Sequence, residues 1–301
     1  MPPPWTCAIV NSGFANLGAM SIPSGVGLLH RQVVWQGSSS PELEGRTFMP
    51  PPRSTQIRWS DSGFKSAIVE QLKAYANSSQ FLDVGANLGQ TMLEMWSLNQ
   101  DVEYFGFEPN PQAFACLQDL ARSIQIKAEL YPWACGASSS PASFFASSIE
   151  DCSATLLPQI RPNTYPSQPP THVATYPLDQ SPGIDRLSPC FVMKIDVEGF
   201  ENEVLRGSEK TIRNKRPFIL CEVLHAHRES EIGLNNARKS QLKFWLDKNG
   251  YRIMEVNLSR EDRNTYLGLT EIGDFRKNVL WKDSPHSCDF LFVPIESEFG
   301  R

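Results

Sequence analysis

Apolar residues along most of the chain follow two alternating patterns. Short apolar segments are typical of buried strands, whereas apolar residues that recur roughly every three or four positions are typical of helices. Phe64, Ile68 and Leu72 lie four apart and indicate one face of a helix. The patterns predict strands at 81–84, 104–107, 124–131, 191–197, 218–223, 251–256 and 289–293, and helices at 64–75, 90–97, from 111 onward, at 199–213 and at 237–249.

The alternation of strands and helices predicts an α/β fold. Strands that are joined through helices form a largely parallel sheet, and such a sheet carries helices on both faces. We therefore expect a Rossmann-like domain over residues 56–301. Asn110 and Pro111 are residue types favoured at the cap and at the first position of a helix, and Gly250 is a type favoured just after a helix end.

Two segments lack this alternation. Residues 1–55 are rich in Pro, Gly and Ser, so we expect them to form an irregular or disordered extension. Residues 134–182 also contain many Ser and Pro, and an irregular segment of this length inside a domain usually serves a function. We expect it to contain a short hairpin at 143–147 and a part that faces a substrate or covers a site.

The composition excludes several classes of protein. The formal net charge is −5 and the basic residues are scattered, whereas nucleic-acid-binding proteins usually carry a basic stripe, so nucleic acid is not an expected partner. No window reaches the roughly 18 apolar residues of a membrane span, and the first residues lack a signal-peptide pattern, so a cytoplasmic location is expected. The seven cysteines form no C-x-x-C pair, which favours reduced thiols over a zinc site. The oligomeric state is left open.

A glycine-bearing turn follows the first predicted strand of the domain. Residues 83–89 read DVGANLG, and ligands of an open α/β sheet bind at this end of the strands. Gly85 and Gly89 would allow a tight turn close to a ligand, and Asn87 can both donate and accept hydrogen bonds. Glu108 ends the next strand, where a carboxylate can accept both hydroxyl hydrogens of an adenosine ribose.

The residues around this turn favour one kind of ligand. The turn lacks the third glycine of a dinucleotide fingerprint, which makes a nicotinamide oxidoreductase a minor alternative. Asp83 adds a carboxylate that suits a ligand with a positive charge and an amino group better than it suits a pyrophosphate. S-adenosylmethionine has both a sulfonium and an amino group, so we expect this cofactor. A purely structural turn is the other alternative.

A second group of polar residues follows two later strands. Asp196 and Glu198 are two apart and so share a side, and Asp196 could act as a general base, hold a divalent cation such as Mg²⁺ together with Glu222, or position a substrate hydroxyl. Glu198 could equally serve as a carboxylate at a helix N-terminus. Glu222 and His225 are expected to face the same crevice, with His225 a second candidate for the base.

These motifs resemble those of the FkbM-type methyltransferases. The resemblance is carried by DVGANLGQT (83–91), FGFEPNP (105–111), KIDVEGFENEVLRGSEKTI (194–212) and the later ILCEVLH (219–225), and it spans roughly residues 60–295. It implies a seven-stranded sheet with an antiparallel last strand, S-adenosylmethionine as methyl donor, and O-methylation of a sugar, polyketide or other small-molecule or glycan acceptor.

The resemblance also implies roles for particular residues. Asp83, Gly85, Asn87 and Gly89 would bind the methionine end of the cofactor, and Glu108 would bind its ribose. Asp196 and Glu198 match the DVEG motif near the reaction centre, so with Glu222 and His225 they are the candidate catalytic residues. Residues 1–55 and 134–182 depart from the family pattern. A non-catalytic S-adenosylmethionine-binding module or partner subunit remains the alternative function.

Overall fold

The computed structural model contains a main α/β body and a few short N-terminal strands. It describes residues 6–11, 30–36, 42–43, 46–47, 56–60, 64–148, 151–160, 169–259, 261 and 265–301. Among these residues, no helix has both the length and the apolar character needed to cross a bilayer.

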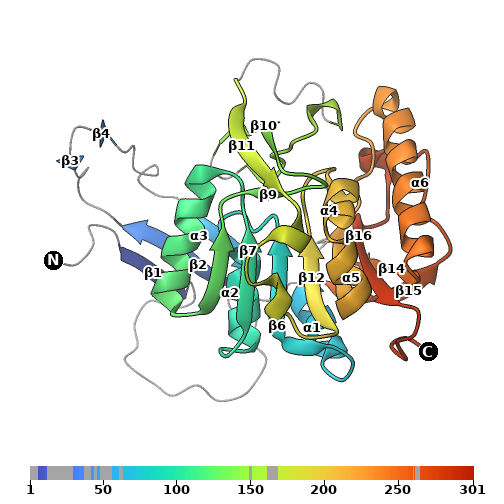
Figure 1. Cartoon of the computed structure of the whole chain (residues 1–301), viewed down its shortest axis with the longest axis horizontal. Helices are drawn as coiled ribbons and strands as arrows, with labels where there is room; N and C mark the ends of the chain where they lie inside the picture. Colours follow the sequence, from blue (N-terminus) through green and yellow to red (C-terminus); the bar gives the residue numbers. More distant parts are fainter. Residues whose placement is uncertain are drawn as a thin grey trace.

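An eight-stranded mixed sheet forms the centre of the molecule (Figure 1). Its five strands from β8 to β13 are parallel, whereas β16 runs antiparallel between β13 and β14, as expected for the last strand. In spatial order the strands are β15 (Tyr266–Ile272), β14 (Tyr251–Leu258), β16 (Asp289–Pro294), β13 (Phe218–Glu222), β12 (Phe191–Ile195), β6 (Asn77–Val84), β7 (Glu103–Phe107) and β8 (Lys127–Tyr131).

The predicted α/β class is confirmed, but the expected count of seven strands is wrong. The eighth strand, β15, pairs with β14 at the edge of the sheet. Its residues are all at least partly exposed, so the segment lacks the apolar run or clean alternation by which a buried strand is recognised.

Helices cover both faces of the sheet and bury a separate core on each. Neighbouring strand residues point to opposite faces, so Phe81 and Tyr104 pack in one core while Leu82 and Phe105 pack in the other. The first core is closed by α1 (Phe64–Leu72), α2 (Gln90–Leu98) and α3 (Pro111–Ile124). The second is closed by α4 (Glu201–Gly207), α5 (Glu209–Lys215) and α6 (Ile232–Lys248).

The helix ends follow the residue types that the sequence places there, with one exception. The Asn110 side chain caps α3 by accepting a hydrogen bond from the Gln112 N–H at 3.1 Å, as expected. Gly250 has φ +67° just after α6, which also agrees with the prediction. The single helix predicted at 199–213 is wrong, because α4 and α5 are separated at Ser208, whose hydroxyl donates to the Val204 carbonyl at 2.7 Å. Such back-bonding favours a bend in the helix.

The described parts of the segment 134–182 form a small sheet beyond the carboxyl ends of the central strands (Figure 1). It contains β9 (Ala134–Cys135), β10 (Ser140–Phe144) and β11 (Thr171–Tyr176), in the order β10-β11-β9. The predicted hairpin at 143–147 is wrong: β10 pairs antiparallel with the distant β11, whose alternating burial gives it one apolar face. Residues 149–150 and 161–168 lie outside the described part.

Five short strands are described in the N-terminal region. Antiparallel pairing joins β1 (Thr6–Asn11), β2 (His30–Gln36) and β5 (Gln56–Ser60), and a second ladder joins β3 (Glu42–Leu43) to β4 (Arg46–Thr47). These strands differ from the irregular extension expected for residues 1–55. The other residues of that range lie outside the described part, so the boundary at residue 55 remains a prediction.

Candidate active site

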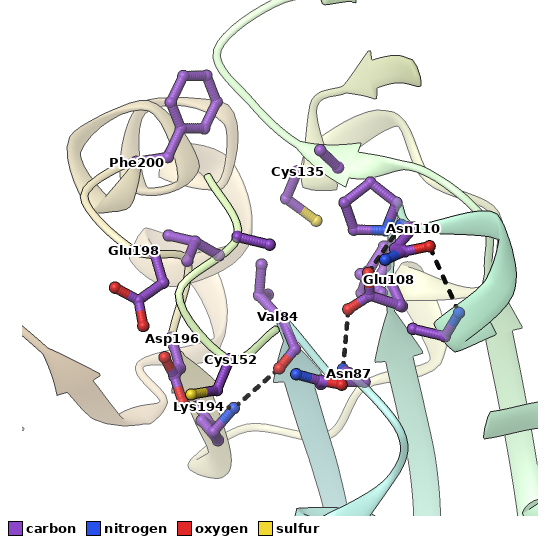
Figure 2. A pocket seen from close by; sticks show the side chains of 18 of the residues that line it. Val84, Asn87, Glu108, Asn110, Cys135, Cys152, Lys194, Asp196, Glu198 and Phe200 are labelled. Carbon is purple, nitrogen blue, oxygen red and sulfur yellow. Dashed lines mark hydrogen bonds and ion pairs between the residues drawn. The ribbon is translucent and has the colours of Figure 1, made fainter. Parts of the chain in front are cut away.

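A cavity of about 200 Å³ opens where β6, β7 and β12 end. This is the carboxyl edge of the parallel strands, where ligands of such sheets bind. Figure 2 shows Glu108 and Asn110 on one side of the cavity and Asp196 and Glu198 on the other. The site therefore brings together residues from motifs that are far apart in the sequence.

The two glycines of the 83–89 turn serve the backbone in different ways. Gly85 has φ +88°, and a Cβ atom there would lie 1.9 Å from the Asp196 carbonyl oxygen, so only glycine lets the β6 and β12 loops approach each other. Gly89 has φ +95°, and its Cβ would press on Leu117 and Leu120 of α3 at 2.9 Å. Gly85 lines the cavity, whereas the structure places Gly89 against α3, behind it.

Glu108 presents a fixed carboxylate to the cavity. Its two oxygens accept hydrogen bonds from the backbone N–H groups of Asn87 at 2.8 Å and Asn110 at 2.7 Å. Burial raises the pKa of Glu108 to about 7, although the two backbone hydrogen bonds act in the opposite direction. The carboxylate is thus held in one orientation with acceptor capacity left for a ligand.

Asn87 supplies an acceptor that no described residue uses. It has φ +48°, in the left-handed region, and lines the cavity. Among the described residues, its Oδ1 atom is buried and has no hydrogen-bond partner. A buried acceptor of this kind is costly unless a ligand or water donates to it, so Asn87 is suited to receive an N–H or O–H group.

Asp83 lies beneath the turn and does not line the cavity. It is fully buried, and its oxygens accept from Lys194 Nζ at 2.9 Å and from the Tyr104 hydroxyl at 2.5 Å. Lys194 also donates to the Gly85 carbonyl at 3.0 Å and lies 3.3 Å from Asp196. Asp83 therefore positions the turn through Lys194 instead of reaching the cavity itself.

Three carboxyl groups meet on the β12 side of the cavity. One ligand oxygen from each of Asp196, Glu198 and Glu222 lies within 4.8 Å of the others. Burial raises the pKa of Asp196, but the charges of Lys194 and Lys65 outweigh burial and leave it below its ordinary value. Burial, and then the charge of Asp196, raise the pKa of Glu222 well above its ordinary value. A proton shared by this hydrogen-bonded pair is therefore held more tightly by Glu222 than by Asp196.

These carboxyl groups have the chemistry of a Mg²⁺ site, and one cation already lies beside them. Oxygen donors are what Mg²⁺ prefers. Here the ammonium group of Lys194 lies 3.3 Å from Asp196 and is shared with Asp83, so it offsets only part of the negative charge. The Mg²⁺ site at Asp196 and Glu222 stays a prediction.

The sequence profile of the Methyltransferase FkbM domain matches residues 83–253, more than half of the chain. The chain belongs to the FkbM methyltransferase family. The resemblance seen in the motifs is thereby confirmed, and the matched range includes all nine candidate residues from Asp83 to His225.

Solved structures with a similar fold share little sequence with this chain. Methyltransferase FkbM from Methylobacillus flagellatus KT is 14% identical, with TM-score 0.42; the match covers 73% of this chain and 44% of that protein. Aeropyrum pernix fibrillarin, solved with natively bound S-adenosyl-L-methionine, is 13% identical over 82% of this chain and 94% of its own, with TM-score 0.35. Precorrin-6y C5,15-methyltransferase of Geobacter metallireducens GS-15 is 12% identical over 75% of this chain and 85% of its own, with TM-score 0.33. No curated protein matches the chain.

His225, another candidate residue of this FkbM-family chain, also lies away from the cavity. His225 is almost fully buried, does not line the cavity, and places its Nδ1 atom 3.1 Å from Lys239 Nζ. Burial, followed by the charge of Lys239, lowers the pKa of His225 to about 4. The structure therefore does not bring His225 together with Asp196, although both follow neighbouring strands.

Lys194 is the site residue of this FkbM-family protein that sequence reasoning overlooked. It lies within the KIDVEG motif, beside the two carboxylates that the sequence analysis selected. Its position in the otherwise apolar strand FVMKI indicates a functional site, because a lysine is buried in such a strand only if it has anionic partners.

The part of the segment 134–182 that lines the cavity of this FkbM-family chain is called the covering segment, and its role toward a substrate stays a prediction. Cys135, Phe144, Cys152 and Leu156 line the cavity from this side. Thr155 anchors the segment by donating from Oγ1 to the Glu198 carbonyl at 2.8 Å. The covering segment is thus hydrogen-bonded directly to the loop that carries Glu198.

Proposed function

We propose that this chain transfers the methyl group of S-adenosylmethionine to a hydroxyl oxygen of a sugar or another small metabolite. The observation that carries the proposal is the pairing, across one cavity, of the anchored Glu108 carboxylate and the unpartnered Asn87 Oδ1 with the carboxyl groups of Asp196 and Glu198. The first pair recognises a ligand and the second faces a reacting group.

The residues of the cavity fit the proposed cofactor. Glu108 keeps acceptor capacity for the two ribose hydroxyls, and Asn87 Oδ1 can accept from an amino group. Phe107, Cys135 and Phe144 give part of the wall an apolar character suited to a flat base. When it is bound, the cofactor supplies an electron-poor methyl group.

Asp196 is the residue we propose to act on the acceptor. Its carboxylate stays ionised because Lys194 and Lys65 lower its pKa. It can therefore accept a hydrogen bond from the acceptor hydroxyl, hold the oxygen in line and receive its proton as the new bond forms. Glu222 donates its hydrogen bond to Asp196 and fixes the orientation of that carboxylate.

Calorimetric titration with S-adenosylhomocysteine tests the cofactor part of the proposal. We expect one site per chain, and a loss of affinity of at least roughly tenfold in Glu108→Ala, because hydrogen bonds to a charged partner contribute about 1.5–3 kcal/mol each. Glu103→Ala is the matched control, since Glu103 lies at the other end of β7 and does not line the cavity.

The possible outcomes test the cofactor and its contact with Glu108. Binding by the wild type and the control, with weaker binding in Glu108→Ala, supports the cofactor and its ribose contact. If folded wild-type protein fails to bind S-adenosylhomocysteine, the proposed cofactor is wrong and the Glu108 site serves another ligand.

A further inference from the structure

A second cavity, of about 360 Å³, opens at the same edge of the large sheet, over β13, β14 and β16. Glu222 ends β13 and is paired in register with Asp289, which begins β16. Leu258 ends β14 and lines the cavity next to them. Because β12 is the neighbour of β13, this cavity adjoins the one that holds Glu108 and Asp196.

The two cavities meet at a pair of hydrogen-bonded carboxyl groups. Asp196 lines the first cavity and Glu222 lines the second. Their side chains share a hydrogen bond, and their oxygens lie within 4.8 Å of each other and of Glu198. A molecule in the second cavity can therefore contact Glu222 directly, and the oxygens of Glu222 and Asp196 lie within 4.8 Å of each other.

The wall of the second cavity combines one aromatic ring with groups that form hydrogen bonds. Trp281 lines it and is 37% exposed. Asp289 lies at the floor, where Ser287 Oγ donates to it at 2.7 Å. His286 and Asp283 also line the cavity. Their imidazole and carboxyl groups mean that the wall offers both hydrogen-bond donors and acceptors.

We propose that the second cavity is the acceptor site, and that it takes an uncharged polyhydroxylated molecule about the size of one sugar ring, stacked on Trp281 with one hydroxyl at the Asp196–Glu222 pair. This inference rests on the proposed methyl transfer and adds the position of the acceptor and its charge. The cavity volume is within the range of small-molecule sites, and an indole ring packs well against an apolar C–H face.

Charge near the cavity disfavours anionic acceptors. Asp283 lines the cavity and the carboxylate of Asp196 lies beside Glu222, whereas Lys282 contributes one ammonium group. A phosphate or carboxylate brought beside Glu222 would meet the like charge of Asp196, which costs free energy in a partly dry site. Hydroxyl groups carry no such cost, because they donate to the carboxyl oxygens.

Fluorine NMR on protein labelled with 5-fluorotryptophan tests this assignment. The Trp281 resonance is identified by its absence in Trp281→Phe, and Trp245 on α6 serves as an internal reference. With S-adenosylhomocysteine at saturation, the protein is titrated with methyl α-D-glucopyranoside, methyl α-L-rhamnopyranoside and myo-inositol. Glucose 6-phosphate is the anionic comparison ligand.

We expect at least one neutral compound to shift the Trp281 resonance and not that of Trp245, and glucose 6-phosphate to bind more weakly. Trp281→Ala should then bind that compound roughly threefold to tenfold less tightly, because it loses the ring contact. Phe244→Ala, which removes a 71% exposed aromatic ring elsewhere on the surface, should leave binding unchanged.

Two results would overturn the inference. Either no neutral compound moves the Trp281 resonance, or the phosphate moves it as strongly as its neutral counterpart. If S-adenosylhomocysteine binds normally in the same samples, only the acceptor site is wrong. If S-adenosylhomocysteine does not bind, the proposed function and the inference that rests on it both fail.

Discussion

Lys194 shows how a single buried residue sets the electrostatics of the site. It is 4% exposed and contacts the carboxylates of Asp83 and Asp196 as well as the Gly85 carbonyl. Burial alone would lower its pKa, but the charges of Asp196 and Asp83 outweigh burial and raise it. Lys194 thus connects the turn of β6 to the reacting carboxylate of β12.

Lys194→Met should therefore destabilise the protein strongly. The change leaves Asp83 buried and without its cation, which typically costs about 3–5 kcal/mol in the free energy of unfolding. Urea denaturation measures this loss. Lys73→Met is the control, because Lys73 forms an exposed ion pair with Glu70 that contributes roughly 0–1 kcal/mol. Equal losses in the two variants would contradict the role of Lys194.

Glu108 should make cofactor binding depend on pH. Its pKa of about 7 means that the carboxyl group is largely protonated at pH 6 and ionised at pH 8. Only the ionised group accepts from both ribose hydroxyls while it keeps its two backbone hydrogen bonds, so affinity should rise as the pH rises through 7. We expect a gain of about tenfold between pH 6 and pH 8.

Titration of S-adenosylhomocysteine across this pH range measures the effect. Glu108→Gln has no titrating group at this position, so its weaker binding should not change with pH. A slope that persists unchanged in Glu108→Gln would assign the pH dependence to another residue.

At the scale of secondary structure, the sequence predicted the regular elements better than their interruptions. The seven predicted strands all exist, and all but β8 bury an apolar face that leaves a clear pattern. The exposed β15 and the bend at Ser208 leave no such pattern, since local hydrogen bonds and an edge position produce them. The motifs located Glu108 and Asp196 correctly at strand ends, because strand ends can be recognised from local sequence. The contact of His225 with Lys239 depends on packing between distant segments, which no local sequence pattern indicates.

The covering segment offers a prediction at this scale. Thr155→Val removes the hydroxyl that donates to the Glu198 carbonyl, and it leaves the Leu157 N–H without its 2.9 Å acceptor. We expect a loss of about 1–3 kcal/mol in the free energy of unfolding, together with S-adenosylhomocysteine binding weakened at least roughly threefold. Calorimetry and urea denaturation of the same preparation measure both effects.

Thr175→Val is the matched control for the covering segment. Thr175 is also a buried threonine whose hydroxyl donates to a backbone carbonyl, that of Ser138 at 2.9 Å, but this contact does not reach the loop that carries Glu198. It should lose similar stability and keep its affinity. If both variants bind equally well, the contact between Thr155 and Glu198 contributes to folding alone.

At the scale of the whole molecule, the sheet topology explains why the two cavities adjoin. The strand order reverses beside β6, which opens a crevice for the first cavity, and the antiparallel β16 inserts next to β13 and brings Asp289 to the same edge as Glu222. The described side chains that fill both cores run from Phe64 to Phe299. The eight strands and six helices of this body therefore stabilise one another.

This arrangement predicts that a chain beginning at Ser54 folds and binds cofactor like the full chain. Its large sheet, both cores and the residues lining both cavities are retained, because all of them lie after residue 63. The melting temperature should stay within about 4 °C, the shift that roughly 1–2 kcal/mol produces in a domain of this size, and the affinity for S-adenosylhomocysteine should be unchanged. Calorimetry on both chains checks this. A truncated chain that aggregates or loses affinity would show instead that β1 and β2, which pair with β5 in the full chain, belong to the folded domain.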